Sequence, residues 1–240
     1  MYKFYLSIVI PAYNEEKKIE KDIREAFNYF KKSKIKGEVI VSTDGVTDGT
    51  NDIVKKLQKK YSNLYLLAYK NKIGKGAAIK KGVAKARGKY IMFADSGYCV
   101  PYSFIANGIK KIDSGFDCAL ASRSTKKSQI KIKQPLYRRI GSKIFGLIAR
   151  NILCIPNQIK DTQCGFKIYK NKIAKRLFLD LQTTSMMFDI EIILLAKKHG
   201  YKMASFPVEW KNDPDTKFNP LTGSVINFKD LYKIKLKYRL

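Results

Sequence analysis

Several features that mark other classes of protein are missing from this sequence of 240 residues. It has one His, and its four cysteines (Cys99, Cys118, Cys154 and Cys164) form no C-x-x-C pair, so a zinc site is not expected and the thiols are expected to be reduced. No stretch reaches the roughly 18 uninterrupted apolar residues that span a bilayer. The N-terminus lacks a signal-peptide cleavage site, and its apolar run is typical of a strand. We therefore expect a protein of the cytosol.

Two common nucleotide-binding motifs are also absent. The sequence contains no GxxxxGK[ST] and no GxGxxG after its first apolar run, which argues against a P-loop or dinucleotide-binding protein. Apolar residues make up 45% of the chain and charged residues 28%, the balance of a globular protein. A chain of this length can bury one full core, so we expect a single domain.

Acidic residues are missing from one long stretch of a strongly basic chain. The formal net charge is +28, and residues 118–160 contain no Asp or Glu. The same stretch carries ten basic residues: Arg123, Lys126, Lys127, Lys131, Lys133, Arg138, Arg139, Lys143, Arg150 and Lys160. A field of one sign favours an anionic membrane leaflet or a phosphorylated substrate, although a merely solvated basic face is the alternative. Without an aromatic RNA-binding motif, no nucleic-acid partner is expected.

Apolar runs in the first half alternate with helical segments. Short buried-strand runs are predicted at 7–11, 39–41, 64–68 and 90–94, with helical spacing between them and Asn14 as the N-cap of the first helix. This alternation indicates an α/β fold, a mainly parallel sheet flanked by helices in one Rossmann-like domain. Ligands of such sheets collect beyond the carboxyl ends of the strands. Three polar clusters, at 12–15, 43–48 and 95–97, fall at those ends.

The second half is less regular. Strands are predicted at 118–122 and 203–208 and helices at 136–155 and 189–199, while the tail 232–240 fits helix and strand alike. The segment 136–155 has an apolar face with Ile140, Ile144, Leu147 and Ile148 and a basic face. Such an amphipathic helix could lie on a membrane, or it could be an ordinary helix packed on the core.

A series of motifs then runs along nearly the whole chain. They are PAYNE (11–15), VSTDGVTDGT (41–50), NKIGKGAAIKKGVAKARGKYIMFADSG (71–97), ASR (121–123), IKDTQCGFKIY (159–169), FDIE (188–191) and VEW (208–210). In this order they resemble the family-2 glycosyltransferases of the GT-A fold. The set is most similar to the dolichyl-phosphate glucosyltransferases and, more distantly, to the polyprenyl-phosphate mannosyltransferases.

The resemblance implies an inverting hexosyltransferase. It would move glucose from UDP-glucose onto dolichyl or another polyprenyl phosphate with Mg²⁺ or Mn²⁺, residues 1–122 binding the nucleotide sugar and 123–240 the acceptor. An alternative within the same enzyme class is a transferase that uses GDP-mannose as donor or another acceptor. An alternative outside the class is a degenerate, non-catalytic protein that binds anionic lipid or RNA. The related enzymes usually carry a membrane segment, and no such apolar segment is found in this sequence. The chain is therefore expected to dock peripherally on the cytosolic face, through its acid-free stretch and its tail from Lys229.

The resemblance also assigns residues on the donor side. Asp95 would hold the metal ion and act in catalysis with Ser96 beside it, but Gly97 stands where the family has a second Asp. Asp44 would hydrogen-bond the base, and Thr43 replaces the first Asp of that pair. Lys75 would meet phosphate at a helix N-terminus, with a solvated surface lysine as the alternative. Four further residues would flank base and ribose: Pro11, Ala12, Tyr13 and Glu15.

Acceptor residues follow in the second half. Arg123 and either Arg138 or Arg139 would hold the lipid phosphate, because the planar guanidinium binds phosphate through two hydrogen bonds. Asp189 is the expected general base for a hydroxyl acceptor. Three other residues would line the acceptor side: Asp161, Gln163 and Glu191. For Asp161 and Glu191, internal ion pairs are the alternative.

Overall fold

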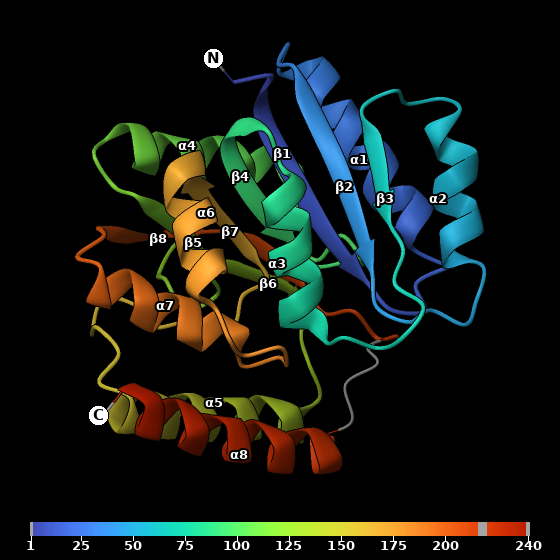
Figure 1. Cartoon of the computed structure of the whole chain (residues 1–240). Coiled ribbons are helices and arrows are strands. Elements are labelled where there is room, and N and C mark those ends of the chain that lie inside the picture. Colours follow the sequence, from blue (N-terminus) through green and yellow to red (C-terminus); the bar gives the residue numbers. More distant parts are fainter. Residues whose placement is uncertain (1, 216–219, 239–240) are drawn as a thin grey trace.

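A sheet of seven strands forms the centre of the molecule (Figure 1), in the order β3-β2-β1-β4-β7-β5-β8. The computed structural model describes residues 2–215 and 220–238, without the side chains of 220–225. The strands of the sheet are β1 (Phe4–Ala12), β2 (Gly37–Thr43), β3 (Leu64–Leu67), β4 (Gly88–Ala94), β5 (Cys118–Ser122), β7 (Phe166–Lys170) and β8 (Met203–Pro207). A separate two-stranded ribbon pairs β6 (Gln129–Ile132) with β9 (Glu209–Lys211).

Helices cover both faces of this sheet. Ile8 of β1 faces one layer with Ile23 of α1 (Ile19–Lys32) and Ile105 of α4 (Ile105–Asp113), whereas its neighbour Val9 faces the other with Ile79 of α3 (Lys75–Lys85). Strands buried on both faces form continuous apolar runs, and the strands predicted from the sequence are runs of this kind. The helices are α1 (Ile19–Lys32), α2 (Thr50–Gln58), α3 (Lys75–Lys85), the 3₁₀ turn η1 (Tyr102–Phe104), α4 (Ile105–Asp113), α5 (Leu136–Ile152), α6 (Asn171–Asp180), α7 (Phe188–Lys198) and α8 (Pro220–Tyr238).

The sheet is parallel except at β7. Strands β1, β2, β3 and β4 pair in parallel, as do β5 and β8, but β7 runs antiparallel between β4 and β5. The predicted mainly parallel α/β sheet is therefore confirmed. Because β7 runs the other way, its first residue, Phe166, lies opposite Ala94 at the end of β4. The antiparallel strand thus brings the DTQCGFK motif to the edge of the sheet where Asp95 lies.

Some local predictions were wrong. Helix α1 begins at Ile19 with Lys18 at its N-cap, so Asn14 is not the cap. Asn14 has a positive φ of 55° instead, and its side-chain oxygen accepts a hydrogen bond from the backbone N–H of Thr47. The chain needs this left-handed turn because it leaves β1 at the sheet edge before it starts α1. The N-cap of α2 is Gly49, and Asp48 just before it accepts the N–H of Thr50 through its carboxylate, at 3.0 Å.

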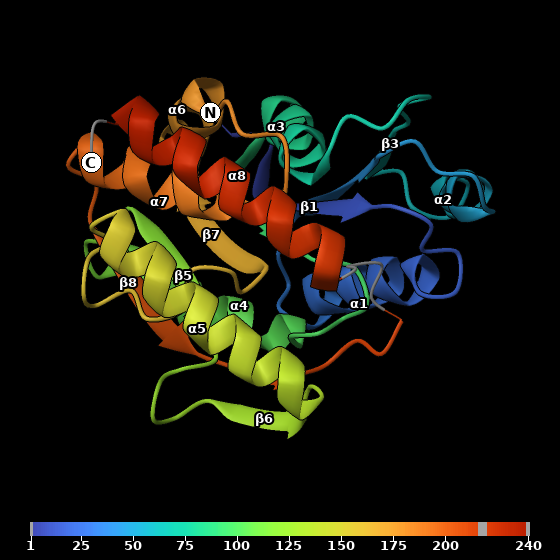
Figure 2. The same ribbon diagram turned by 90° about the horizontal axis from the view of Figure 1, so that it is seen from below.

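Helices α5 and α8 lie side by side beneath the sheet (Figures 1 and 2). The Phe145 and Phe228 rings of the two helices meet edge to face at 5.3 Å. Ala149 of α5 and Leu231 and Ile234 of α8 are buried against the body. The ambiguous tail is thus helical as far as Tyr238; residues 239 and 240 lie outside the described part. Within the described ranges, every helix is too short or too polar to cross a bilayer.

Candidate active site

The carboxyl ends of β1, β2 and β4 lie next to one another, as the order of the strands requires. These ends, at Ala12, Thr43 and Ala94, form what we call the carboxyl edge. Asp44 and Asp95 follow two of them directly. The predicted convergence of the polar clusters is therefore confirmed, and the site is built from loops on neighbouring, fully buried strands.

Asp95 is held at this edge by the DTQCGFK motif. Its backbone N–H donates to the carbonyl of Gly165 at 2.8 Å, and its carboxylate lies 2.7 Å from the Nζ of Lys75. The side chain is 32% exposed, so it can reach a ligand. A Cβ on residue 165 would lie 2.0 Å from the Asp95 carboxyl group. The glycine of the motif is required because the Asp95 carboxylate fills the space a side chain would take.

Gly165→Ala is therefore expected to displace Asp95 without unfolding the sheet. The Asp95 carboxylate would have to leave its position beside Lys75, and we expect at least a tenfold weaker binding of UDP with Mn²⁺, measured by calorimetry. Gly146→Ala is the matched control, because a Cβ there meets no atom within 4 Å. Unchanged nucleotide binding by Gly165→Ala would contradict the placement of Asp95.

Lys75 is the first residue of α3 and lies at the same edge. Its side chain is 20% exposed and also lies 5.9 Å from the centre of the Phe188 ring. Burial alone would lower the pKa of Lys75, but the carboxylates of Asp95 and Asp189 outweigh burial and raise it. Lys75 is a permanently charged, positioned ammonium group rather than the solvated lysine of the alternative interpretation. At the N-terminus of α3 the N–H of Gly76 donates to the carbonyl of Thr184 at 2.7 Å, so the ammonium group of Lys75 is the group here that suits a phosphate.

Asp44 holds the loop that presents Lys75. The side chain is buried, and its Oδ1 atom accepts hydrogen bonds from the N–H groups of Ile73 and of Gly74, the latter at 2.9 Å. The expected contact of Asp44 with a base remains a prediction. On the same loop, the Nζ of Lys72 lies 4.2 Å from the centre of the Tyr13 ring. Tyr13 therefore lies at the carboxyl edge with one cation–π partner, while Pro11 and Ala12 are buried in β1.

Glu15 belongs to a cluster of charges at the start of α1. It is 8% exposed and pairs with Lys18 at 2.7 Å. Burial raises the pKa of Glu15. Lys18 also contacts Asp213 at 2.6 Å, so the segment after β9 is fastened to the PAYNE motif. Glu15, predicted on the donor side, is thus joined through Lys18 to Asp213.

Asp22 is a residue that the sequence analysis missed. It is 1% exposed on α1, and its Oδ2 atom accepts the N–H of Gly97 at 2.9 Å. Burial raises the pKa of Asp22 to about 7. A signal was present in the sequence, because Asp22 falls on the apolar face of α1 between Ile19 and Ile23, where a charge needs a partner. Asp22 fixes the loop that follows Asp95.

Arg123 and Asp161 form a bidentate pair. The Nε and Nη2 atoms of Arg123 each lie 2.8 Å from an oxygen of Asp161, whose Oδ2 also accepts the backbone N–H of Arg123. The guanidinium lies 5.3 Å from the centre of the Trp210 ring. Burial raises the pKa of Asp161, but the charge of Arg123 outweighs burial and holds it below its usual value. Asp161 thus has the internal ion pair of the alternative interpretation, while Nη1 of Arg123 lies outside this pair.

Asp189 lies deep in the protein, at the start of α7. It is 3% exposed and forms an ion pair with Lys167, whose side chain is fully buried and also donates to the carbonyl of Cys164 at 2.9 Å. Burial raises the pKa of Asp189. A carboxylate in this position has a fixed partner and little access to solvent. Its geometry is that of a positioning group near Lys75 rather than of a base that reaches an acceptor.

Glu191, two residues further along α7, links this helix to α8. Its side chain is fully buried, pairs with Lys237 of α8, and accepts hydrogen bonds from the Tyr238 hydroxyl at 3.0 Å and the Thr183 N–H at 2.7 Å. These contacts hold the pKa of Glu191 below its usual value against the effect of burial. Glu191 is therefore an internal ion-pair partner, the alternative left open by the sequence, and the structure does not place it on an acceptor surface.

Gln163 lies beside the Arg123–Asp161 pair, whereas Arg138 and Arg139 lie on α5. Gln163 is half-buried, and its backbone N–H donates to Asp161 at 3.3 Å. Arg138 is half-buried and Arg139 exposed in the first turn of α5. Their expected contact with a phosphate stays a prediction.

Known proteins resemble this chain in sequence. The model of the family described as "Glycosyl transferase family 2" matches residues 7–178. A dolichyl-phosphate beta-glucosyltransferase of Trichomonas vaginalis is 32% identical over 98% of this chain and 74% of its own length. The enzyme of the same name from Dictyostelium discoideum is 32% identical, over 98% and 75%, and that of Homo sapiens 29%, over 97% and 75%.

Solved structures share the fold at low identity. Glucosyl-3-phosphoglycerate synthase of Mycobacterium tuberculosis, solved with Mn²⁺, UDP and phosphoglyceric acid, superposes with a TM-score of 0.71 at 15% identity, covering 98% of this chain and 78% of that one. Mannosyl-3-phosphoglycerate synthase of Rubrobacter xylanophilus gives 0.73 at 15%, covering 98% and 74%. The fold is thus that of GT-A glycosyltransferases.

Proposed function

The chain belongs to glycosyl transferase family 2, and from this membership we propose that it transfers glucose from UDP-glucose to dolichyl phosphate or another polyprenyl phosphate, with inversion at the anomeric carbon. Relatives named dolichyl-phosphate beta-glucosyltransferases align over almost its whole length, which supports this acceptor and this sugar.

The observation that carries the proposal is the position of Asp95. It is a partly exposed carboxylate at the end of a buried strand, next to the Lys75 ammonium group and the N-terminus of α3. The leaving group of a nucleotide sugar is a diphosphate whose negative charge grows as the glycosidic bond breaks. Mg²⁺ or Mn²⁺, when bound, would offset part of that charge. Lys75 would orient the phosphates from the other side through its positive charge.

We assign the donor to residues 1–122 and the acceptor to 123–240. On the donor half, Tyr13 and the loop held by Asp44 would flank the base. On the acceptor half, Arg123 is already oriented by Asp161, so its remaining N–H groups are directed without further loss of side-chain entropy.

The proposed acceptor explains why a general base is unnecessary. A lipid phosphate is ionised near neutral pH, so its oxygen can attack the anomeric carbon without first losing a proton. The catalytic task is then to hold the phosphate oxygen in line with the departing UDP. We therefore assign Asp189 to the positioning of Lys167 and Lys75 rather than to proton transfer.

A donor screen tests the function. Purified protein with dolichyl phosphate and Mg²⁺ or Mn²⁺ should form a glucosyl lipid from UDP-glucose. A mannosyl lipid from GDP-mannose would support the alternative within the class. If no sugar is transferred, thermal unfolding with nucleotide decides: a ligand at about 100 Kd stabilises by about 2.7 kcal/mol. A flat response to all UDP- and GDP-sugars would favour the non-catalytic binding protein.

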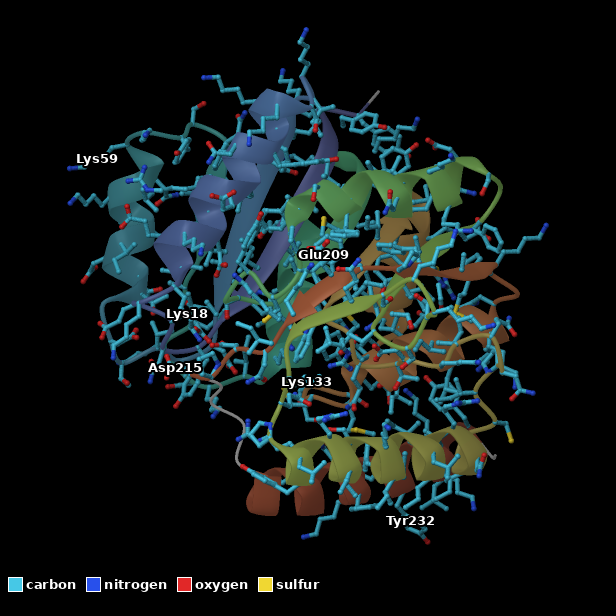
Figure 3. The ribbon with its side chains drawn as sticks, turned by 180° about the vertical axis from the view of Figure 1, so that it is seen from behind. Lys18, Lys59, Lys133, Glu209, Asp215 and Tyr232 are labelled. Atoms are coloured by element: carbon cyan, nitrogen blue, oxygen red, sulfur yellow. The ribbon has the colours of Figure 1, made fainter. Side chains whose placement is uncertain are left out.

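We also propose that the α5–α8 layer rests on the cytosolic leaflet of a membrane. The layer exposes large apolar side chains that soluble surfaces seldom gather in one place. Tyr232 points away from the body on this side (Figure 3). Basic residues surround the apolar ones and suit anionic lipid. The exposed apolar side chains are Leu136, Tyr137, Ile140, Ile144 and Leu147 on α5 and Ile226, Phe228, Tyr232 and Leu236 on α8.

Charges in this layer should weaken binding to vesicles. Replacing Ile144 and Leu147 by Asp puts two carboxylates on side chains that are 55% and 59% exposed. We expect at least a tenfold loss of affinity for vesicles with anionic lipid, measured by sedimentation, while glucosyl transfer to a short-chain, water-soluble acceptor stays near wild type. Leu179→Asp is the control, since Leu179 is 68% exposed but lies on α6. Equal losses in both proteins would contradict the docking surface.

A further inference from the structure

Gly97 and Asp213 fit together in space. Gly97 stands where the family's second metal-site carboxylate is expected, and it has a positive φ of 91°. A Cβ on residue 97 would lie 2.9 Å from the Oδ2 atom of Asp213 and 3.3 Å from its Cγ. The carboxylate of Asp213 therefore occupies the space into which a side chain at position 97 would project. Position 97 thus lacks the expected carboxylate, and the carboxylate of Asp213, 116 residues further along the chain, lies at the same place.

The same relation holds for the other carboxylate of the site. Asp95 fills the space above Gly165, and Asp213 the space above Gly97. Asp95 comes from the end of β4, whereas Asp213 comes from the segment after β9. Two carboxylates from distant parts of the chain are thus each seated against a glycine at one edge of the sheet.

Asp213 is held firmly at this place. The backbone N–H of Lys211 donates to the carbonyl of Cys99 at 3.0 Å, which ties the end of β9 to the loop after Asp95. The Nζ of Lys18 contacts Asp213 at 2.6 Å, and Lys18 also lies beside Asp215 (Figure 3), at 3.7 Å. Gly97, against which Asp213 is seated, comes two residues after Asp95 in the chain. The two carboxylates therefore lie at the same loop.

We propose that Asp213 supplies the carboxylate missing at position 97, so that Asp95 and Asp213 together hold the divalent cation of the donor site. This inference rests on the proposed function. Carboxylate oxygens are ligands that Mg²⁺ and Mn²⁺ prefer, and Mg²⁺ commonly takes only one or two of them beside water and substrate phosphates. Within residues 2–215 and 220–238 no cluster of three or more such side chains stands ready for a metal. The remaining ligands would accordingly be the diphosphate and water.

Lys18 and Lys75 give each carboxylate a counterion before the cation binds. Lys18 has a second partner in Glu15, at 2.7 Å, so it keeps an ion pair when Asp213 turns to a cation. Lys18 would then change from pairing with both Asp213 and Glu15 to pairing with Glu15 alone. The arrangement explains why PAYNE is followed by a lysine that reaches across 195 residues to Asp213.

The test is direct binding of Mn²⁺, measured by electron paramagnetic resonance in the presence of UDP. Asp213→Asn is expected to weaken Mn²⁺ at least tenfold. Asp215→Asn is the matched control: it lies near the same Lys18 but away from Gly97, and Mn²⁺ affinity should stay within twofold of wild type. If Asp213→Asn binds Mn²⁺ as tightly as wild type, the inference is wrong.

The Lys18→Met variant shows whether Asp213 binds the cation itself or acts only by positioning Lys18. If Asp213 holds the cation itself, removing Lys18 leaves Mn²⁺ affinity unchanged or higher. A loss as large as that of Asp213→Asn would show that Asp213 acts only through Lys18, and would overturn the assignment. The wild-type protein shows which hypothesis has failed. If it binds neither UDP nor Mn²⁺ in the presence of UDP, the proposed function is wrong. If the wild type and Asp213→Asn both bind UDP and Mn²⁺, only the role of Asp213 is wrong.

Discussion

Asp95→Asn is expected to reduce glucosyl transfer by about a hundred- to a thousandfold, the loss typical when one group that stabilises transition-state charge is removed. The amide has nearly the same shape and fits against Gly165, and the backbone bond from residue 95 to the Gly165 carbonyl is kept. What is lost is a full negative charge beside Lys75 at the carboxyl edge. The rate of glucosyl-lipid formation at saturating UDP-glucose measures the effect.

The fold should survive this change. Asp95 is partly exposed, so the melting temperature is expected to fall by only a few degrees. Asp52→Asn is the control: its side chain is 83% exposed on α2 and pairs with Lys55, and activity should not change. Near-full activity of Asp95→Asn would remove the basis for the donor site.

Arg123→Ala should combine the largest loss of stability with a defect in acceptor use. The Asp161 side chain, 5% exposed, would remain as an unpaired buried charge. Breaking a buried pair by removing one partner costs about 3–5 kcal/mol. Urea unfolding measures this loss. In the fraction that stays folded, KM for dolichyl phosphate should rise more than KM for UDP-glucose.

Two variants separate stability from recognition. Arg123→Lys keeps a positive charge for Asp161 but not the planar fork, so it should regain part of the stability and little of the acceptor use. Arg176→Ala breaks an exposed pair with Asp180 and is expected to cost no more than about 1 kcal/mol. Equal increases in KM for donor and acceptor in Arg123→Lys would contradict an acceptor role.

The first half of the fold was predictable because its signals are local. Strands such as β1 and β2 are apolar on both faces, and a polar residue that follows them must lie at the sheet edge. Asp44 and Asp95 were found in this way. Strand β7 was missed because it is short, contains the buried Lys167 and leads directly into α6. A buried lysine interrupts the apolar run by which a central strand is recognised.

Contacts between distant segments could not be predicted. Asp213 contacts Gly97 and Lys18, far away in the chain, and no period or motif relates the three. Asp189 and Glu191 share a motif that resemblance places near the acceptor, but their lysine partners come from β7 and α8. Only the three-dimensional arrangement shows that these two acids are occupied by internal partners.

The two acids of α7 also join the lower layer of the molecule to its reaction centre. Glu191 forms an ion pair with Lys237 in the last turn of α8. Asp189, on the same turn of α7, forms an ion pair with Lys167 and helps to raise the pKa of Lys75. Helix α7 therefore connects α8 to the carboxyl edge through two buried acids. If the proposed membrane surface is correct, a tilt of α8 on lipid would displace Glu191 and, through α7, the Asp189 carboxylate that influences Lys75.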